Sequence, residues 1–285
     1  MIDPFLEFSF MRRALVAVFA LALSAAPLGC LLMVRRMSLV GDAMSHAMLP
    51  GAALGFLVAG LSLPAMSIGG FAAALLVALG AGFVTRNTQQ REDTSFAALY
   101  LIALAMGVVL VSSGGTQIDL MHLLFGSVLA VDDAALLQIA VVSGLSCIML
   151  ALFYRPLVMD SLDPGFAQRM GRTGAYTHAL LIVLMVANLV SAFHALGTLM
   201  AIGLMMLPPA AARFWCKTLP GIMGLGVALA MVSGFAGLAL SYHHALPSGP
   251  SIVLFAGALY CISMAVGPHG SVRMALRKPR FHTTA

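Results

Sequence analysis

The sequence contains very little charge. Only 9% of its 285 residues are Asp, Glu, Lys or Arg, whereas 61% are hydrophobic. The mean hydropathy is +1.02. A typical soluble domain has about 25% charged residues, so this chain lacks the polar surface that a soluble fold of its size requires. The composition indicates an integral membrane protein.

Two classes of enzyme are excluded by missing residue pairs. A phosphate-binding P-loop requires Gly directly before Lys, but Lys217 follows Cys216 and Lys278 follows Arg277. The HExxH helix of zinc proteases requires His directly before Glu, and neither of the two glutamates follows a histidine. The chain therefore has neither a P-loop ATPase site nor an HExxH protease site, and we expect that it is not an enzyme.

Cysteine is scarce and never paired. The four cysteines are isolated in the sequence, with no CxxC motif: Cys30, Cys147, Cys216 and Cys261. This spacing predicts neither a disulfide framework nor a thiolate zinc site.

Long apolar runs dominate the rest of the chain. A helix of about 20 apolar residues crosses the hydrocarbon core of a bilayer. Candidate spans lie near 14–34, 39–60, 65–85, 94–114, 134–153, 176–195, 196–212, 222–242 and 252–267. We therefore expect an all-α, polytopic transmembrane bundle of eight or nine spans, forming one domain over residues 1–285.

The basic residues fall in alternate connections between these runs. Thirteen of the 15 lie near 35–36, 86–91, 155–172, 213–217 and 273–280. By the positive-inside rule these connections are cytoplasmic, so topology explains the net charge of +5 and no nucleic-acid partner is needed. Arg12 and Arg13 precede the first span and break the alternation, which leaves the orientation of the N-terminal end open.

Two ionisable side chains lie within the second apolar run. Asp42 and His46 are four residues apart, so on a helix they share one face. A carboxylate and an imidazole are suitable ligands for Zn²⁺, Mn²⁺ or Fe²⁺. Ionisable groups inside a membrane segment usually mark an ion pathway, and we interpret this pair as part of a metal site whose other ligands come from elsewhere.

The depth of the pair supports this interpretation. Counted from Arg36 at the cytoplasmic interface, Asp42 lies about 9 Å and His46 about 15 Å into a core about 30 Å thick. Pro50 and Gly51 then predict a helix break near mid-depth, as in many transport sites. The alternative is structural: Asp42 pairs with Arg35 or Arg36, and His46 forms a hydrogen bond inside the bundle.

Other intramembrane polar groups have a simpler explanation. Asn188 and His194 could complete a metal shell. Hydrogen bonds between helices are the favoured interpretation for both residues, because polar side chains commonly join helices inside membranes.

A second polar stretch, residues 155–174, connects two expected spans on the cytoplasmic side. Asp163 is placed as an N-cap, Pro164 as the first helical residue and Gly171 as the C-terminal stop. The resulting helix of about seven residues is too short to span a membrane. It suits docking into a groove on another protein, and the alternative is a loop helix resting on the membrane surface.

Together these segments resemble the ABC-3 permeases, the membrane subunits of ABC importers for zinc, manganese and iron. The match runs without a gap from Arg35 to Gly51, through Arg-Arg-Met-Ser-Leu-Val-Gly-Asp-Ala-Met-Ser-His-Ala-Met-Leu-Pro-Gly. It continues in residues 124–129, 162–171 and 197–211. More distantly, the order of these blocks is similar to that in vitamin B12 and siderophore importer permeases, which implies a type II importer fold.

The resemblance also implies a mechanism and partners. The family's metal ligands map onto Asp42 and His46. Contact with a separate ABC ATPase subunit maps onto a coupling segment that contains Asp163, Pro164, Gly165, Ala167 and Gly171. A homodimer of the permease in the bacterial inner membrane, supplied by a periplasmic metal-binding protein, is expected.

We therefore predict the permease subunit of an ABC importer for a divalent transition metal, with zinc favoured over manganese or iron. The metal is cargo, and no permanently bound cofactor is expected. The alternative is a stand-alone secondary transporter that exchanges protons for metal through Asp42 and His46.

Overall fold

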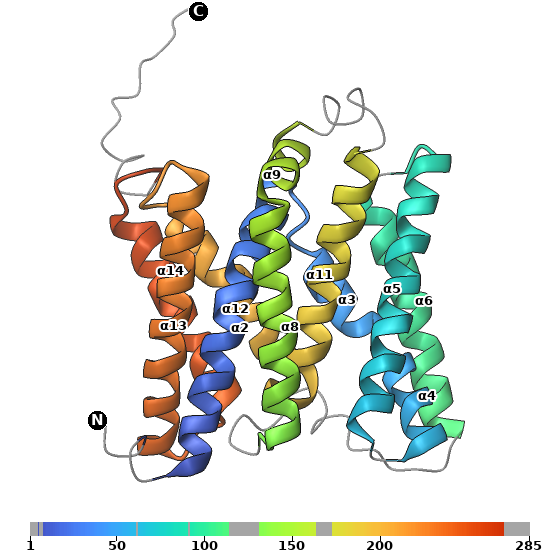
Figure 1. The fold of residues 1–285 in the computed structure, drawn as a ribbon, viewed down its shortest axis with the longest axis horizontal. Coiled ribbons are helices and arrows are strands. Elements are labelled where there is room, and N and C mark those ends of the chain that lie inside the picture. Colours follow the sequence, from blue (N-terminus) through green and yellow to red (C-terminus); the bar gives the residue numbers. More distant parts are fainter. Residues whose placement is uncertain are drawn as a thin grey trace, which may run out of the picture.

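The computed structural model describes residue 5 and residues 8–60, 62–90, 92–113, 131–163 and 173–270. All regular structure in these ranges is helical. Figure 1 shows the longer helices running side by side as an up-and-down bundle. The helices are α2 (Ser9–Val34), α3 (Val40–Ala47), α4 (Leu49–Ala59), α5 (Leu63–Asn87), α6 (Glu92–Ser113), α8 (Asp133–Leu152), α9 (Tyr154–Leu162), α11 (Thr173–Leu196), α12 (Thr198–Ala212), α13 (Leu219–His244) and α14 (Ser248–Val266).

The all-α transmembrane fold is confirmed, but the number of full-length spans is smaller than expected. Within the described ranges, seven helices are long and apolar enough to cross a membrane. The two other expected spans fall short for different reasons. The run 39–60 is divided into α3 and α4, and the run 196–212 forms only the 15 residues of α12.

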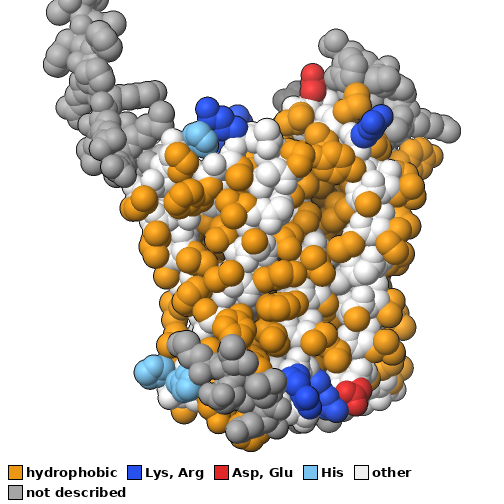
Figure 2. Space-filling model, turned by 60° about the vertical axis from the view of Figure 1, so that its left-hand side comes forward, with side chains coloured by type: hydrophobic (Ala, Val, Ile, Leu, Met, Phe, Trp, Pro, Cys, Tyr) orange, Lys and Arg blue, Asp and Glu red, His pale blue; other side chains and the backbone are white. Residues whose placement is uncertain are grey.

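The surface matches a membrane environment. In the face shown in Figure 2, hydrophobic side chains cover the height of the bundle, while charged and histidine side chains gather at its two ends. The residues that directly follow α2, α5 and α12 are Arg35, Thr88 and Arg213. Figure 1 shows that these three helices each finish at the same end of the bundle as α9. This is the end that the positive-inside rule assigns to the cytoplasm.

The two N-terminal arginines lie at the opposite, outer end. Helix α2 has 26 residues and so is about 39 Å long, which exceeds the hydrocarbon thickness. Arg13 there forms an ion pair with Asp133 at the start of α8, with 3.0 Å between Nε and Oδ1. Helix α2 is therefore long enough to cross the hydrocarbon core from the outer end of the bundle to the cytoplasmic end. At the outer end, the Asp133 carboxylate balances the charge of Arg13.

The bundle interior contains a small polar cluster. Asn188 of α11 accepts a hydrogen bond from Ser24 of α2 (2.5 Å) and donates one to Ser146 of α8 (2.7 Å). All three residues are buried. The expected role of Asn188 in joining helices is confirmed, whereas the side chain of His194 lies outside the described residues.

Helix α9 was not expected from the sequence. It begins directly after α8 and ends at Leu162, with Asp163 as its C-cap. The sequence predicts that Asp163 also caps the start of a following helix, whose residues Pro164, Gly165, Ala167 and Gly171 lie outside the described residues. The prediction of a coupling helix over 163–171 therefore stays a prediction, while α9 is an additional element immediately before it.

Candidate functional site

A tight turn at the end of α2 directs the chain back into the bundle. The Arg36 N–H donates to the Met33 carbonyl (3.1 Å), and the Met37 N–H donates to the Leu32 carbonyl (2.9 Å). These two bonds form a Schellman motif, in which the residue after the C-cap is left-handed. Arg36 occupies that position with φ 61°. Three residues after Met37, α3 begins.

The helix that follows is interrupted near its middle. Helix α3 ends at Ala47, Met48 forms the junction, and Pro50 lies in the first turn of α4. Pro50 has no N–H to donate to the carbonyl of His46, and its ring crowds that carbonyl. The interruption therefore lies immediately after the two candidate ligands.

Small residues hold the second half of this helix in place. A Cβ atom at Gly51 would lie 2.0 Å from the Gly69 carbonyl oxygen of α5, and one at Gly107 of α6 would lie 3.1 Å from Pro50. Backbones can approach this closely only where side chains are absent. Helix α4 thus packs tightly against α5 and α6, and Figure 1 shows it at the end of the bundle opposite α9.

The structure brings the candidate ligands within reach of one ion. The Nε2 atom of His46 lies 3.8 Å from an Asp42 carboxylate oxygen, which is too long for a hydrogen bond. Metal-to-donor distances of about 2.1 Å allow the two donors of one ion to be up to about 4.2 Å apart. Both atoms can therefore ligate the same cation.

The environment of His46 is only partly satisfied. Its ring stacks on Tyr100 of α6, with centroids 6.3 Å apart and an angle of 27° between the planes. Its Nδ1 atom is buried and has no hydrogen-bond partner. In the isolated chain 33% of the His46 side chain and 58% of the Asp42 side chain are exposed. The pair is accessible to an ion and is not consumed by internal hydrogen bonds.

A pocket of about 150 Å³ lies beside Asp42, between α3 and α6. It is lined by Leu39, Val40, Asp42, Ala43, Asp93, Phe96, Ala97 and Tyr100. Asp93 adds a second carboxylate that the sequence analysis did not assign to the site. Its spacing of seven residues from Tyr100 places both on one face of α6, which is the signal that could have identified it.

The described residues alone do not complete a metal shell. Among them, no three His, Cys, Asp or Glu side chains are grouped so that they could hold a metal ion. The structure brings Asp42, His46 and the Asp93-lined pocket together and places Asp160 and Asp163 elsewhere, on and after α9. The site formed by the described residues is therefore a partial one.

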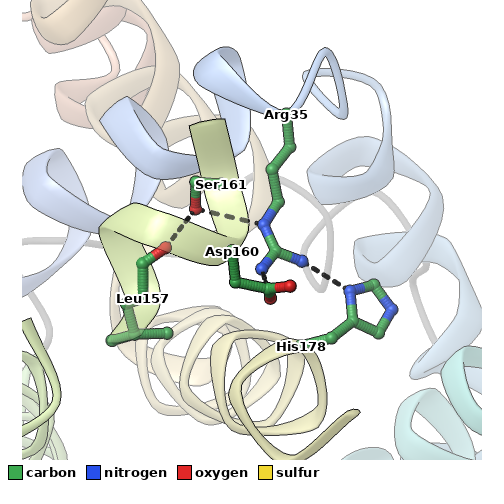
Figure 3. A network of polar contacts seen from close by, with 5 residues as sticks. All are labelled: Arg35, Leu157, Asp160, Ser161 and His178. Atoms are coloured by element: carbon green, nitrogen blue, oxygen red, sulfur yellow. Dashed lines mark hydrogen bonds and ion pairs between the residues drawn. The ribbon is translucent and has the colours of Figure 1, made fainter. Parts of the chain in front are cut away.

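The contacts of Arg35 exclude it as an ion-pair partner of Asp42. Its guanidinium forms an ion pair with Asp160 of α9, donates to Ser161 (3.1 Å) and contacts Nδ1 of His178 on α11 (2.6 Å). Figure 3 shows these partners surrounding the guanidinium. Arg35 is thus engaged by α9 and α11, not by Asp42, because the turn at Arg36 separates it from α3.

Comparison with known proteins decides the family. The model of the ABC 3 transport family matches residues 7–267. The chain belongs to this family. The resemblance found in the sequence is thereby confirmed over nearly the whole length of the protein.

Relatives of similar length share about a third of the sequence. The manganese transport system membrane protein of Halalkalibacterium halodurans is 32% identical over 271 residues, covering 95% of this chain and 91% of that protein. The manganese import system permease protein of Streptococcus parasanguinis is 33% identical, covering 94% of each. A Haemophilus influenzae protein named "Probable iron transport system membrane protein" is 30% identical, covering 93% of this chain and 96% of its own length.

Solved structures confirm the fold. PsaBC from Streptococcus pneumoniae, solved in complex with Fab, has a TM-score of 0.82 at 29% identity, covering 97% of this chain and 98% of that one. A second structure, described as "An inward-facing conformation of a putative metal-chelate type ABC transporter", has a TM-score of 0.68 at 18% identity, covering 92% of this chain and 87% of that one. The protein is a multi-span membrane permease of a bacterial ABC metal importer and resides in the cell membrane.

Proposed function

We propose that this ABC 3 family permease forms a path for Mn²⁺ into the cell and that Asp42 and His46 ligate the ion in transit. The observation that carries this proposal is the 3.8 Å separation of the two donors on an interrupted helix beside a carboxylate-lined pocket. An open pair of ligands binds an ion without trapping it, because the remaining coordination positions are free for water or for other ligands.

Manganese replaces zinc as the favoured cargo. The carboxylate of Asp42 and the imidazole of His46 suit both Zn²⁺ and Mn²⁺, so these ligand types do not discriminate between the two metals. Two relatives named for manganese transport now favour Mn²⁺, and the Asp93 carboxylate adds an oxygen donor of the kind that Mn²⁺ prefers. Uptake of Mn²⁺, Fe²⁺ and Zn²⁺ in direct competition tests the assignment, and a clear preference for Zn²⁺ would reverse it.

The exposure of Asp42 supports a homodimer. A carboxylate well inside the hydrocarbon region is costly when it faces lipid, yet 58% of this side chain is exposed in a single chain. A second copy of the permease covers the surface around Asp42 and leaves a water-filled path between the two chains. The same partner would supply ligands beyond those that the described residues of one chain offer.

The remaining partners follow from the family. ATP is hydrolysed by a separate ABC ATPase subunit, which contacts residues 163–171, and a periplasmic metal-binding protein delivers the ion. The alternative, a proton-coupled transporter acting alone, predicts metal uptake into liposomes that hold only this chain and an ion gradient. The ABC mechanism predicts uptake only when the ATPase, ATP and the binding protein are also present.

Site variants test the ligand assignment. Asp42→Ala and His46→Ala should each reduce uptake by about tenfold or more, since even outer-sphere changes at metal sites cost roughly 10- to 100-fold. Matched controls are Asp133→Asn and His244→Ala, because both residues are exposed at the outer end of the bundle. Normal metal accumulation in both site variants would disprove their role as ligands.

A further inference from the structure

Arg35 joins three helices through one buried side chain. It is the C-cap of α2, and its guanidinium reaches Asp160 and Ser161 on α9 and His178 on α11. Only 6% of the Arg35 side chain and 6% of the Asp160 side chain are exposed. Figure 3 shows the partners approaching from different sides of the planar group. We call these four residues the Arg35 cluster.

The geometry of the cluster depends on arginine. A guanidinium presents its donors in a fixed planar fork, whereas a lysine ammonium is a single point charge on a flexible stem. Lysine could keep the charge opposite Asp160 but could not hold Ser161 and His178 in the same arrangement. Ser161 is further fixed because its hydroxyl donates to the Leu157 carbonyl (2.6 Å).

The buried ion pair between Arg35 and Asp160 is better explained by its effect on helix placement than by a contribution to the free energy of folding. Removing two charges from solvent costs free energy that their attraction often only balances, so a buried ion pair is weak evidence of net stabilisation. What such a pair does provide is a fixed relative placement of the elements that carry it. Here those elements are the end of α2 and the last turn of α9.

The cluster lies between the two parts of the molecule that transport must connect. On one side, Arg35 is followed by the tight turn at Arg36 and then by α3, which carries Asp42. On the other side, Asp160 and Ser161 immediately precede Asp163, where the proposed ATPase contact begins. Asp160 is 125 residues from Arg35 in the sequence, so the cluster is a tertiary connection between these segments.

We propose that Arg35 is a positioning residue that couples displacement of α9 to α3 and thereby links ATP hydrolysis to movement of the metal site. The proposal rests on the proposed function in one respect: residues 163–171 contact the ATPase. When the ATPase subunits move that contact, α9 moves with it. The Arg35 cluster transmits the movement to the turn that begins the Asp42 helix.

The experiment measures metal transported per ATP hydrolysed. The permease and its ATPase are reconstituted together in liposomes with the binding protein, and Arg35→Lys and Asp160→Asn are compared with wild type. Arg36→Gln is the matched control, because it removes a neighbouring charge that is exposed and outside the cluster. Assembly with the ATPase and basal ATP hydrolysis are measured for each variant.

We expect both cluster variants to assemble and hydrolyse ATP while the metal-to-ATP ratio falls about tenfold or more, within the roughly 5- to 150-fold range of typical site-to-site couplings. The double variant should lose no more than the worse single variant, because residues in one network act non-additively. Arg36→Gln should keep the wild-type ratio. Loss of folding alone would not produce this pattern, since it lowers transport and ATP hydrolysis together.

Two results would overturn the proposal. One is a wild-type ratio in both Arg35→Lys and Asp160→Asn. The other applies if neither variant assembles. Ser161→Ala, which removes one hydroxyl group and its two hydrogen bonds, is then measured, and a wild-type ratio in that variant would overturn the proposal. The proposed function is tested separately with the wild-type complex, where absence of Mn²⁺ uptake would refute manganese transport. The ratio of metal transported to ATP hydrolysed can be measured with whichever divalent metal the complex carries.

Discussion

Replacing Gly51 with alanine should destabilise the permease, because there is no space for a methyl group between α4 and α5. The new Cβ atom would lie 2.0 Å from the Gly69 carbonyl oxygen and 2.6 Å from the Ala73 Cβ atom. A Cβ atom essentially never lies closer than 3.0 Å to a non-bonded heavy atom, so α4 and α5 must separate by about 1 Å. A backbone carbonyl cannot rotate away as a flexible side chain would.

The expected cost lies at the upper end of the range for overpacking, about 3 kcal/mol. With the entropy of unfolding of a soluble domain of 285 residues, this corresponds to a decrease in Tm of about 5 °C. Uptake should also fall, because a displaced α4 moves Pro50 and with it the end of α3 that carries His46. Thermal unfolding of purified protein in detergent measures the first effect, and metal uptake measures the second.

The matched control is Gly82→Ala in α5, where the added methyl group meets open space. Alanine is favoured over glycine inside a helix by about 0.5 to 1 kcal/mol, so this variant should be as stable as wild type or slightly more stable. Equal stability of Gly51→Ala and Gly82→Ala would refute the conclusion that α4 and α5 pack backbone to backbone.

Three further outcomes are expected. Arg36→Gly should raise stability by about 0.5 to 1 kcal/mol, because glycine adopts the left-handed conformation at φ 61° without steric cost; an unchanged or lower Tm would contradict this. Asn188→Leu should lower stability by about 1 kcal/mol, the scale of hydrogen bonds between membrane helices, while Asn87→Leu on the exposed end of α5 should have little effect on unfolding. Asp93→Asn should weaken Mn²⁺ uptake while leaving Tm unchanged, because the exposed carboxylate lines the pocket beside Asp42; uptake equal to wild type would remove Asp93 from the path.

The spans could be recognised from the sequence because lipid imposes a local rule. Each run must be long and apolar enough by itself to cross the hydrocarbon core, so helices such as α8 and α13 match the expected segments closely. The division of the run 39–60 was also signalled locally, since Pro50 removes a backbone donor wherever it stands in a helix. The short helix α9 gave no comparable signal, because it neither spans the membrane nor has strong caps.

The sequence by itself thus determined the membrane class, the all-α fold, the alternating topology and the pairing of Asp42 with His46 on one helical face. Only the tertiary structure decided which groups surround them. The partner of Arg35 is Asp160 and the pocket beside Asp42 includes Asp93, and both pairings join segments far apart in the chain. Hydropathy and helical spacing describe each segment alone, whereas such contacts depend on how the helices pack against one another.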